Sequence, residues 1–280
     1  MTVRTGARPW RAGVIAAGWG ERLRGAVATP KPLVRVAGHA LIDRVLASLA
    51  EVEPSEVAAV FVEPVQGEGG YIVPPPGWLE KLSALCRRHG ILLVADEVQS
   101  GMGRTGRMWA VEHTGVEPDV LLTAKGLASG LPLGAFVARA ELMEHWPPGA
   151  HGSTYGGSPV PCAAGLATLA VIREQGLLGN AREQGTFLLD GLARIQERAS
   201  WLVEDVRGLG LMIGVEFPDA ALAEAVQLAA FRRGLLVLEA GESAVRLSPP
   251  LVVTRAQCET ALSLFGAAID EVITSDGTQL

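Results

Sequence analysis

Three short apolar runs, each ending close to charged residues, constrain the fold of this chain more than any other feature. They span residues 57–62, 91–95 and 120–122. Runs of this length and composition are typical of strands buried on both faces of a parallel sheet. A helix is predicted between the first two runs, from Trp78 to about His89, with Gly90 ending it. The pattern therefore predicts an α/β protein built on a parallel sheet.

The residues that follow these runs are the first candidates for a site. Glu63 follows the first run, Asp96 the second and Lys125 the third. In open α/β sheets, binding sites lie at the carboxyl ends of the strands. We therefore expect the three side chains at one edge of the sheet. For each carboxylate alone, a helix cap or a salt bridge is the favoured interpretation, and the three residues together make it less so.

Lys125 is the only charged residue between Thr123 and Gly134. An amine in such apolar surroundings is expected to be poorly solvated, which lowers its pKa and makes it a nucleophile toward carbonyl groups. The alternative is that Lys125 ends a strand and reaches water.

The composition excludes several classes of protein. The chain has 280 residues, 49% of them hydrophobic, and a formal charge of -6. This is a globular composition without the basic surface typical of nucleic-acid or membrane binding. Its three cysteines are far apart in apolar contexts, which favours buried thiols and a cytoplasmic location. No signal peptide is recognised, and the histidines show no metal-binding spacing.

Four motifs, in this order, resemble those of class III aminotransferases, which are pyridoxal-phosphate enzymes. They are Glu-Pro-Val-Gln-Gly-Glu-Gly-Gly (63–70), Asp-Glu-Val-Gln-Ser-Gly-Met-Gly-Arg-Thr-Gly (96–106), Thr-Ala-Lys-Gly (123–126) and Gly-Ser-Thr-Tyr-Gly-Gly-Ser-Pro (152–159). The similarity runs from about Leu49 to about Val272. It implies a fold-type-I PLP-transferase-like large domain, incomplete and spanning residues 51–175, followed by a smaller α+β domain at 176–280.

The resemblance also implies roles for the residues of these motifs. Lys125 resembles the lysine that holds the cofactor as a Schiff base and moves the proton during transamination. Asp96 resembles the aspartate that keeps the pyridine nitrogen protonated, which makes the ring an electron sink. Val98 would pack on the ring and Gln99 would bind its hydroxyl. Ser153 and Thr154 resemble the pair that reaches the partner's cofactor phosphate, so a homodimer is expected.

Three further residues are candidates for binding substrate. Glu63 is included because it shares the strand edge with Lys125. Glu68 resembles a gating carboxylate that pairs with an arginine when the substrate has no second carboxylate. Arg246 resembles the arginine that holds the substrate carboxylate through a bidentate pair. The implied reaction moves an amino group to 2-oxoglutarate from a small-molecule donor, a 4-aminobutyrate-like ω-amine first and acetylornithine second.

The first fifty residues do not match the four motifs. The spacing of Gly18, Gly20, Arg22 and Lys31 resembles the start of a nucleotidyltransferase, in which a glycine-rich turn and basic side chains surround nucleotide phosphates. The acidic metal ligands of such enzymes have no counterpart. Nucleotidyl transfer therefore stays an alternative, as does an inactive chimeric chain. Since family members have a phosphate-binding helix before the Glu63 strand that is not recognised here, we expect poor turnover.

Finer expectations concern the remaining segments of the chain. A nearly all-apolar buried helix is predicted at 161–173, and a helix beginning at Asn180 with Glu183 in a capping box. Strands are expected at 203–207, 211–217, 235–239 and 245–247, around a helix at 220–233. Thr254 and Gln257 should cap the last helix. The glycine-rich segment 100–106 is expected to be a surface turn at the dimer interface, with a phosphate-binding nest as the alternative.

Overall fold

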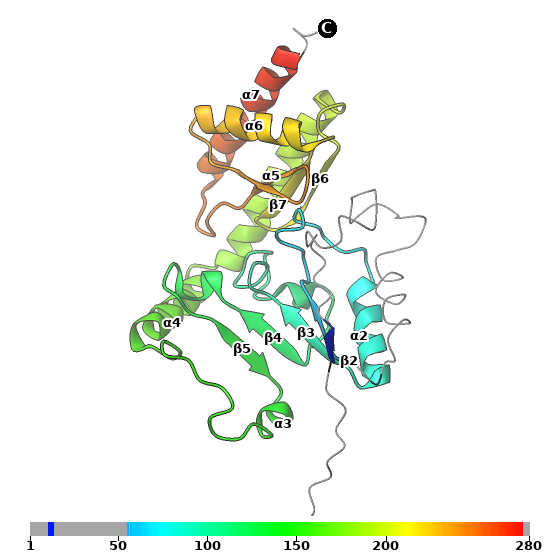
Figure 1. Cartoon of the computed structure of the whole chain (residues 1–280). Coiled ribbons are helices and arrows are strands. Elements are labelled where there is room, and N and C mark those ends of the chain that lie inside the picture. The colour runs from blue at the N-terminus through cyan, green and yellow to red at the C-terminus, as the bar shows by residue number, and fades with distance from the viewer. Residues whose placement is uncertain (1–10, 14–54, 56, 277–280) are drawn as a thin grey trace, which may run out of the picture.

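The computed structural model describes residues 11–13, 55 and 57–276. Within these residues the chain forms two sheets joined by a long helix, as Figure 1 shows. The predicted α/β class is confirmed. The segment 1–50, with Gly18, Gly20, Arg22 and Lys31, lies outside the described residues apart from 11–13, so its nucleotidyltransferase resemblance stays a prediction.

The first sheet has five strands in the order β1-β2-β3-β4-β5. β1 to β4 run parallel, and β5 pairs antiparallel with β4. The strands, the helices and the two 3-10 turns of this region are β1 (Arg11–Gly13), β2 (Val57–Val62), α2 (Trp78–His89), β3 (Leu92–Asp96), η3 (Ala110–His113), β4 (Val120–Thr123), η4 (Lys125–Ala128), β5 (Ala135–Ala138), α3 (Ala140–Met143) and α4 (Pro159–Glu174).

The helix α2 completes the predicted βαβ unit with the predicted bounds. Gly77 before it and Gly90 after it both adopt left-handed backbone angles, and the Gly90 amide bonds back to the carbonyl of Arg87. Such a glycine ends a helix at low steric cost. The apolar face of α2, which includes Leu79 and Leu82, packs with β2 and β3 into one core.

The second sheet has four antiparallel strands in the order β6-β7-β9-β8. The helices α5, α6 and α7 pack with it around a large apolar core. The elements of this region are α5 (Leu177–Arg198), β6 (Asp205–Leu209), β7 (Met212–Glu216), α6 (Ala220–Arg232), β8 (Leu238–Ala240), β9 (Ala244–Leu247) and α7 (Arg255–Asp276).

Most boundaries in the second region differ from the prediction by one to three residues, and one cap was wrong. Helix α5 begins at Leu177 after Gly176, not at Asn180. The Asn180 side chain instead donates to the carbonyls of Leu251 (2.7 Å) and Val253 (3.0 Å). The predicted box before α7 is present, because the Thr254 and Gln257 amides each bond to the other's side chain.

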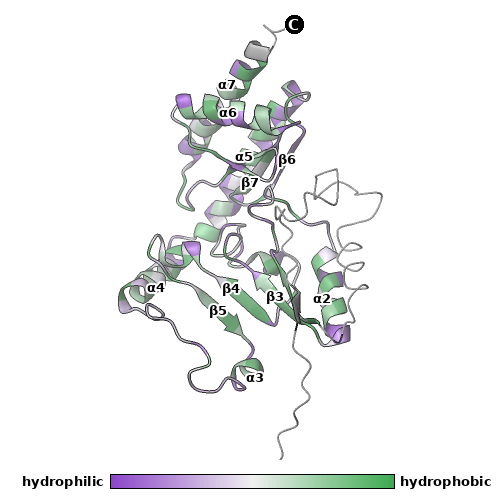
Figure 2. Cartoon of the chain, viewed as in Figure 1, coloured by the Kyte–Doolittle hydropathy of each residue, from purple (hydrophilic) through white to green (hydrophobic). Residues whose placement is uncertain are grey.

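The prediction of a buried helix at 161–173 was wrong. Helix α4 forms, but Val160, Leu166 and Leu169 are exposed among the described residues. Figure 2 shows hydrophobic residues along β4, β5 and much of α4. An apolar composition predicted the helix, whereas its burial depends on what packs against it.

The described residues contain neither a membrane-spanning helix nor a metal-binding cluster. None of the helices there combines the length and apolar character needed to cross a membrane. In the same part of the chain, no three His, Cys, Asp or Glu side chains cluster in a way that could hold a metal ion. Cys86, Cys162 and Cys258 are free thiols, and the first and last are buried.

Candidate active site

The carboxyl ends of β2, β3 and β4 bring three predicted residues to one edge of the first sheet. Glu63 follows β2 directly, Asp96 is the last residue of β3, and Lys125 lies two residues beyond β4. The three strands are neighbours and parallel, so their ends meet. Asp96 and Lys125 both influence the pKa of Glu63. The order and direction of the three strands therefore place two carboxylates and an amine at the same edge of the sheet.

Glu63 is half-buried, and burial is the main cause that raises its pKa. The Gly67 amide, which donates to Glu63 Oε2 at 2.8 Å, opposes this effect. The Asp96 charge raises the pKa further and the Lys125 charge lowers it. Glu63 thus fixes the start of the loop that follows β2 while it shares the electrostatic field of the strand edge.

Lys125 begins the 3-10 turn η4 with an unusual backbone conformation. Its φ is 26°, and the preceding Ala124 has φ -156° and ψ -127°. A left-handed conformation in a residue with a Cβ is strained by about 1–3 kcal/mol and is common at functional sites. The side chain is exposed among the described residues. The expectation of a poorly solvated amine was therefore wrong for the described part of the chain.

Asp96 and Glu97 occupy successive positions with opposite surroundings. Asp96 is half-buried, and its Oδ1 accepts from the Val98 amide at 3.0 Å. Glu97 is 1% exposed and accepts from Ser100 Oγ (2.6 Å) and the Val111 amide (2.8 Å). Glu97 was not identified as a functional residue from the sequence. Its position directly after Asp96 was the available signal, because successive side chains at the end of a strand point to opposite faces of the sheet. Glu97 holds the loop that follows β3 in place.

That loop, residues 100–106, was predicted to be a surface turn, and this was wrong. All its residues are buried except Arg104, which is half-buried. Arg104 Nη1 donates to the carbonyl of Pro249, and the Leu211 amide donates to the Arg104 carbonyl at 3.0 Å. Arg182 Nη1 donates to the Gly106 carbonyl at 2.6 Å. The glycines allow the second region to pack directly on this backbone.

A cavity of about 760 Å³ opens beside Lys125. Its lining includes Val98, Gln99 and Lys125, together with Met102, Arg104 and Ser248. Asp96 and Glu63 are not among the residues that line it. Val98 and Gln99 therefore share a space with the lysine, as the motif predicted, while the two carboxylates lie beside that space at the strand edge.

The structure also brings Glu68, Gln99 and Arg246 together. Arg246, on β9, places Nη1 at 2.6 Å from Glu68 Oε1, and Gln99 Nε2 donates to the same oxygen at 2.7 Å. The hydrogen bond from Arg246 is the main cause that lowers the pKa of Glu68. A Cβ on Gly67 would lie 2.5 Å from the Gln99 amide, so a larger residue there would move the Gln99 side chain away from Glu68.

Two residues beside this group were missed from the sequence. The Arg246 guanidinium lies over the ring of Tyr71, 5.9 Å from its centroid. Tyr71 Oη and Ser248 Oγ are 2.8 Å apart. Ser248 lies two residues after Arg246, and such a spacing places two side chains of a strand on the same face. This spacing was the available signal, and nothing comparable marked Tyr71.

Ser153 and Thr154 are not brought to Lys125. Both are exposed on the segment between α3 and α4. Neither side chain has a hydrogen-bond partner among the described residues. Their role toward a partner subunit's cofactor stays a prediction.

A comparison with family models matches residues 15–269 to "Aminotransferase class-III". The chain belongs to this family. Class III aminotransferases depend on pyridoxal phosphate. The match begins earlier than the motifs indicated, at residue 15 rather than near Leu49, so it includes part of the segment compared with nucleotidyltransferases.

Curated class III relatives resemble this chain over about half of their own length. Acetylornithine aminotransferase of Synechocystis sp. is 43% identical over 221 residues, which cover 78% of this chain and 51% of that protein. The 4-aminobutyrate aminotransferase GabT of Escherichia coli K12 is 42% identical over 228 residues, covering 78% and 53%. The chain thus spans about half the length of the curated relatives it matches.

Solved structures of transaminases confirm the predicted fold class. A transaminase from the marine bacterium Virgibacillus superposes with a TM-score of 0.80 at 33% identity, covering 84% of this chain and 57% of that one. Ornithine aminotransferase from Toxoplasma gondii gives a TM-score of 0.79 at 35% identity, covering 85% and 56%. The described class III fold therefore corresponds to slightly more than half of these chains.

Proposed function

We propose that this chain provides the lysine-bearing part of a pyridoxal-phosphate site that transfers an amino group from an amino acid to a 2-oxo acid. The observation that supports it best is the meeting of Glu63, Asp96 and Lys125 at one edge of the sheet. The proposed donor is a 4-aminobutyrate-like ω-amine or acetylornithine, in line with the names of the relatives. The proposed acceptor is 2-oxoglutarate.

The donor set fits this cofactor. An exposed primary amine, Lys125 Nζ, can bond to an aldehyde. Asp96 uses Oδ1 for the Val98 amide, and Oδ2 has no hydrogen-bond partner among the described residues, so it is free to bind a protonated ring nitrogen. The cavity beside Lys125 offers Val98 as an apolar contact and Gln99 as a hydrogen-bonding group.

Each side chain then has a distinct task. Pyridoxal phosphate, when bound, supplies an electron sink that stabilises negative charge at the substrate carbon that bears the amine. Lys125 Nζ would take the proton from the amine-bearing carbon of the donor in one half-reaction and deliver a proton to the carbon that receives the amino group in the other, since it is the only amine at this edge within the described residues. Asp96 holds a proton on the ring nitrogen by its negative charge. Glu63 holds the start of the loop after β2 through the Gly67 amide, and its carboxylate interacts with the charge of Lys125.

Arg246 is the proposed binding group for a substrate carboxylate. Its guanidinium can form two parallel hydrogen bonds to a carboxylate, which fixes the direction of the ligand as well as its charge. Glu68 occupies this group in the structure at 2.6 Å. A ligand carboxylate must therefore displace Glu68, whereas a donor without one leaves the ion pair intact.

A homodimer is part of the proposal. Ser153 and Thr154 are exposed and have no hydrogen-bond partner among the described residues, and apolar side chains of the neighbouring helix α4 are exposed. These features favour a role for the segment toward a second copy of the chain.

Labelling the lysines tests the cofactor site directly. The protein is incubated with pyridoxal phosphate, reduced with borohydride and mapped by peptide mass spectrometry. We expect the label on Lys125 and not on Lys31 or Lys81. Lys81 is a matched control, because it is also exposed. Lys125→Ala should abolish the label and Lys81→Ala should keep it.

Two results would contradict the proposal. A label spread over Lys31, Lys81 and Lys125 would show unspecific surface chemistry. Formation of glutamate from 4-aminobutyrate or acetylornithine with 2-oxoglutarate that is unchanged in Lys125→Ala would show that the lysine is not the catalytic group.

A further inference from the structure

The loop that contains Glu68 is closed on itself and lies against the second sheet. We call residues 66–72 the Glu68 loop. Gln66 and Ile72 exchange backbone hydrogen bonds of 3.0 and 3.2 Å at its base. The amides of Gly70 and Tyr71 both donate to the Gly67 carbonyl inside it. Its backbone shape is thus defined locally, but its position depends on what holds it from outside.

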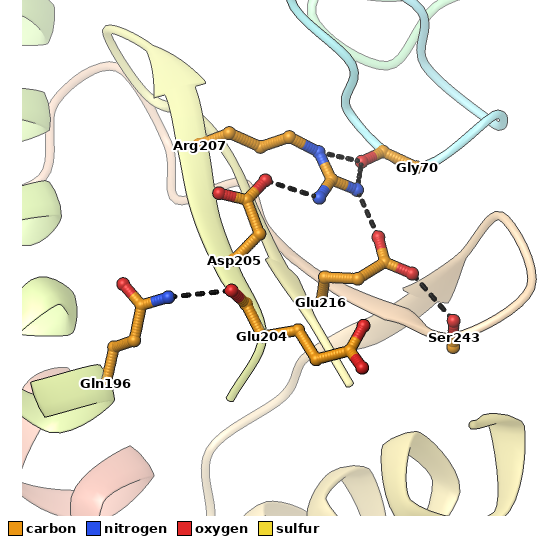
Figure 3. A network of polar contacts seen from close by, with 7 residues as sticks. All are labelled: Gly70, Gln196, Glu204, Asp205, Arg207, Glu216 and Ser243. Carbon is orange, nitrogen blue, oxygen red and sulfur yellow. Dashed lines mark hydrogen bonds and ion pairs between the residues drawn. The ribbon is translucent and has the colours of Figure 1, made fainter. Parts of the chain in front are cut away.

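Arg207 holds the loop from the second sheet. This β6 residue has a side chain only 9% exposed, and its Nε (3.1 Å) and Nη2 (2.6 Å) both donate to the Gly70 carbonyl, as Figure 3 shows. The same guanidinium pairs with Asp205 at 3.0 Å and with Glu216 at 2.6 Å. Ser243 Oγ donates to the other Glu216 oxygen at 2.6 Å.

A second contact fixes the loop beside Glu68 itself. The Gly241 amide, in the turn between β8 and β9, donates to the Glu68 carbonyl at 2.7 Å. The backbones approach so closely that a Cβ on Gly241 would lie 2.8 Å from the Gly69 carbonyl oxygen, and one on Gly214 would lie 2.9 Å from that of Gly70. The loop therefore rests on the same sheet that bears Arg246.

We infer that Arg207 is a positioning residue that holds Glu68 on Arg246 and thereby sets how strongly the site discriminates against ligands with a free carboxylate. Among the described residues, Arg207 forms no hydrogen bond or ion pair with either Glu68 or Arg246. Arg207 fixes the Gly70 carbonyl, two residues from Glu68. Because the loop backbone is already held, the Glu68 carboxylate binds Arg246 without a further loss of backbone conformational entropy. A ligand carboxylate competes with this preorganised pair.

The ion pair is suited to such competition. Glu68 is 68% exposed at its side chain and can leave, whereas Arg246 is 18% exposed and stays. If the backbone of the Glu68 loop becomes more mobile, the Glu68 carboxylate binds Arg246 more weakly, while Arg246 itself stays in place. Loosening the loop should therefore strengthen the binding of an external carboxylate, whereas general damage to the site would weaken it.

The test uses Arg207→Lys, because lysine keeps the positive charge and loses the planar fork. The probe is glutarate, a dicarboxylate without an amino group, and its dissociation constant is measured by titration calorimetry. We expect roughly 3- to 10-fold tighter binding in Arg207→Lys, since one charge-assisted contact is lost from the competitor. Glu68→Gln should also bind glutarate more tightly, and Arg207→Lys should add little in that background.

Two controls separate this role from a structural one. Arg255→Lys makes the same chemical change at an exposed ion pair with Glu183 and should leave glutarate binding unchanged. Ser243→Ala removes a single hydrogen bond from Glu216 and should shift binding in the same direction by a smaller factor. If Arg207→Lys does not fold, Ser243→Ala provides the test.

Hydrogen exchange reports on the loop without any ligand. Peptides that contain residues 66–72 should exchange faster in Arg207→Lys, while peptides from α7 should not change. Unchanged exchange in the loop, weaker glutarate binding in both variants, or no glutarate binding even to Glu68→Gln would overturn the inference. The effect on substrate choice rests on the proposed function, but neither readout needs cofactor or turnover, so a failed Lys125 label would refute that function separately.

Discussion

The two sheet regions bury their apolar residues to different extents. In the second region, α5, α6 and α7 pack with the sheet around residues that include Phe217, Phe265 and Ile269, all at 0% exposure. In the first region, α2 and the adjoining strands form a smaller core, while Val137 on β5 and Leu166 on α4 are exposed among the described residues. The candidate site lies mostly in the first, less enclosed region.

The difference shows that stability and chemistry are distributed unequally. The second region is organised by apolar packing, which stabilises in proportion to buried area. The strand edge of the first region is organised by hydrogen bonds to charged groups such as Glu97, which matter because an unsatisfied buried group is costly. Arg246 and Arg207 extend from the well-packed region toward the polar one, so the stable part supports the part with the catalytic candidates.

A core deletion in the second region should have the largest effect. Phe265→Ala removes a ring that is 0% exposed and should lower the free energy of unfolding by about 3–5 kcal/mol. Leu166→Ala, at a residue 71% exposed in the first region, should change it by no more than about 0.5 kcal/mol. Urea unfolding followed by circular dichroism measures both. Equal effects of the two changes would remove the contrast between the regions.

A polar deletion in the first region should have the next largest effect. Glu97→Ala leaves the Val111 amide and the Ser100 hydroxyl without their acceptor, which should cost roughly 2–4 kcal/mol, taking about 1–2 kcal/mol for each group from the lower part of the range for unsatisfied buried groups. Glu97→Gln keeps one acceptor oxygen and the volume, so it should cost less than about 1 kcal/mol. The same urea experiment applies. If glutamine were as harmful as alanine, the charge rather than the hydrogen bonding would be what the loop requires.

The smallest expected effect is a pH dependence in the first region. Burial raises the pKa of Glu97 above its ordinary value of 4.5, although Ser100 and Val111 oppose the shift. Between that value and the raised one, the folded state binds more protons than the unfolded state, so its stability falls as pH increases and then levels off. The difference in unfolding free energy between wild type and Glu97→Gln should fall with pH in this window. A difference that rises with pH would contradict the assigned direction.

The local pattern of the sequence was sufficient for much of the fold. The bounds of α2 were predicted because Gly90 and the apolar spacing both lie within the helix or next to it. The capping box formed by Thr254 and Gln257 at the start of α7 was predicted because the two residues are only three positions apart in the sequence. Asn180 failed as a cap because its partners, Leu251 and Val253, are distant in the sequence. Side chains that bond locally are predictable, and those that bond across the molecule are not.

For the site, the sequence by itself determined which side chains end the central strands. Glu63, Asp96 and Lys125 meet because parallel neighbouring strands end at one edge, and this follows from the apolar runs alone. The family motifs added Gln99, Glu68 and Arg246 as candidates but not their mutual geometry.

Only the tertiary structure decided how those candidates combine. Glu68 and Arg246 are 178 residues apart, and Arg207 and Gly70 are 137 apart, yet each pair is in direct contact. The structure also decided that the amine of Lys125 is exposed and that residues 100–106 are buried. The physical reason is that burial and long-range pairing depend on how the two sheets pack together, whereas periodicity and capping depend only on neighbours along the chain.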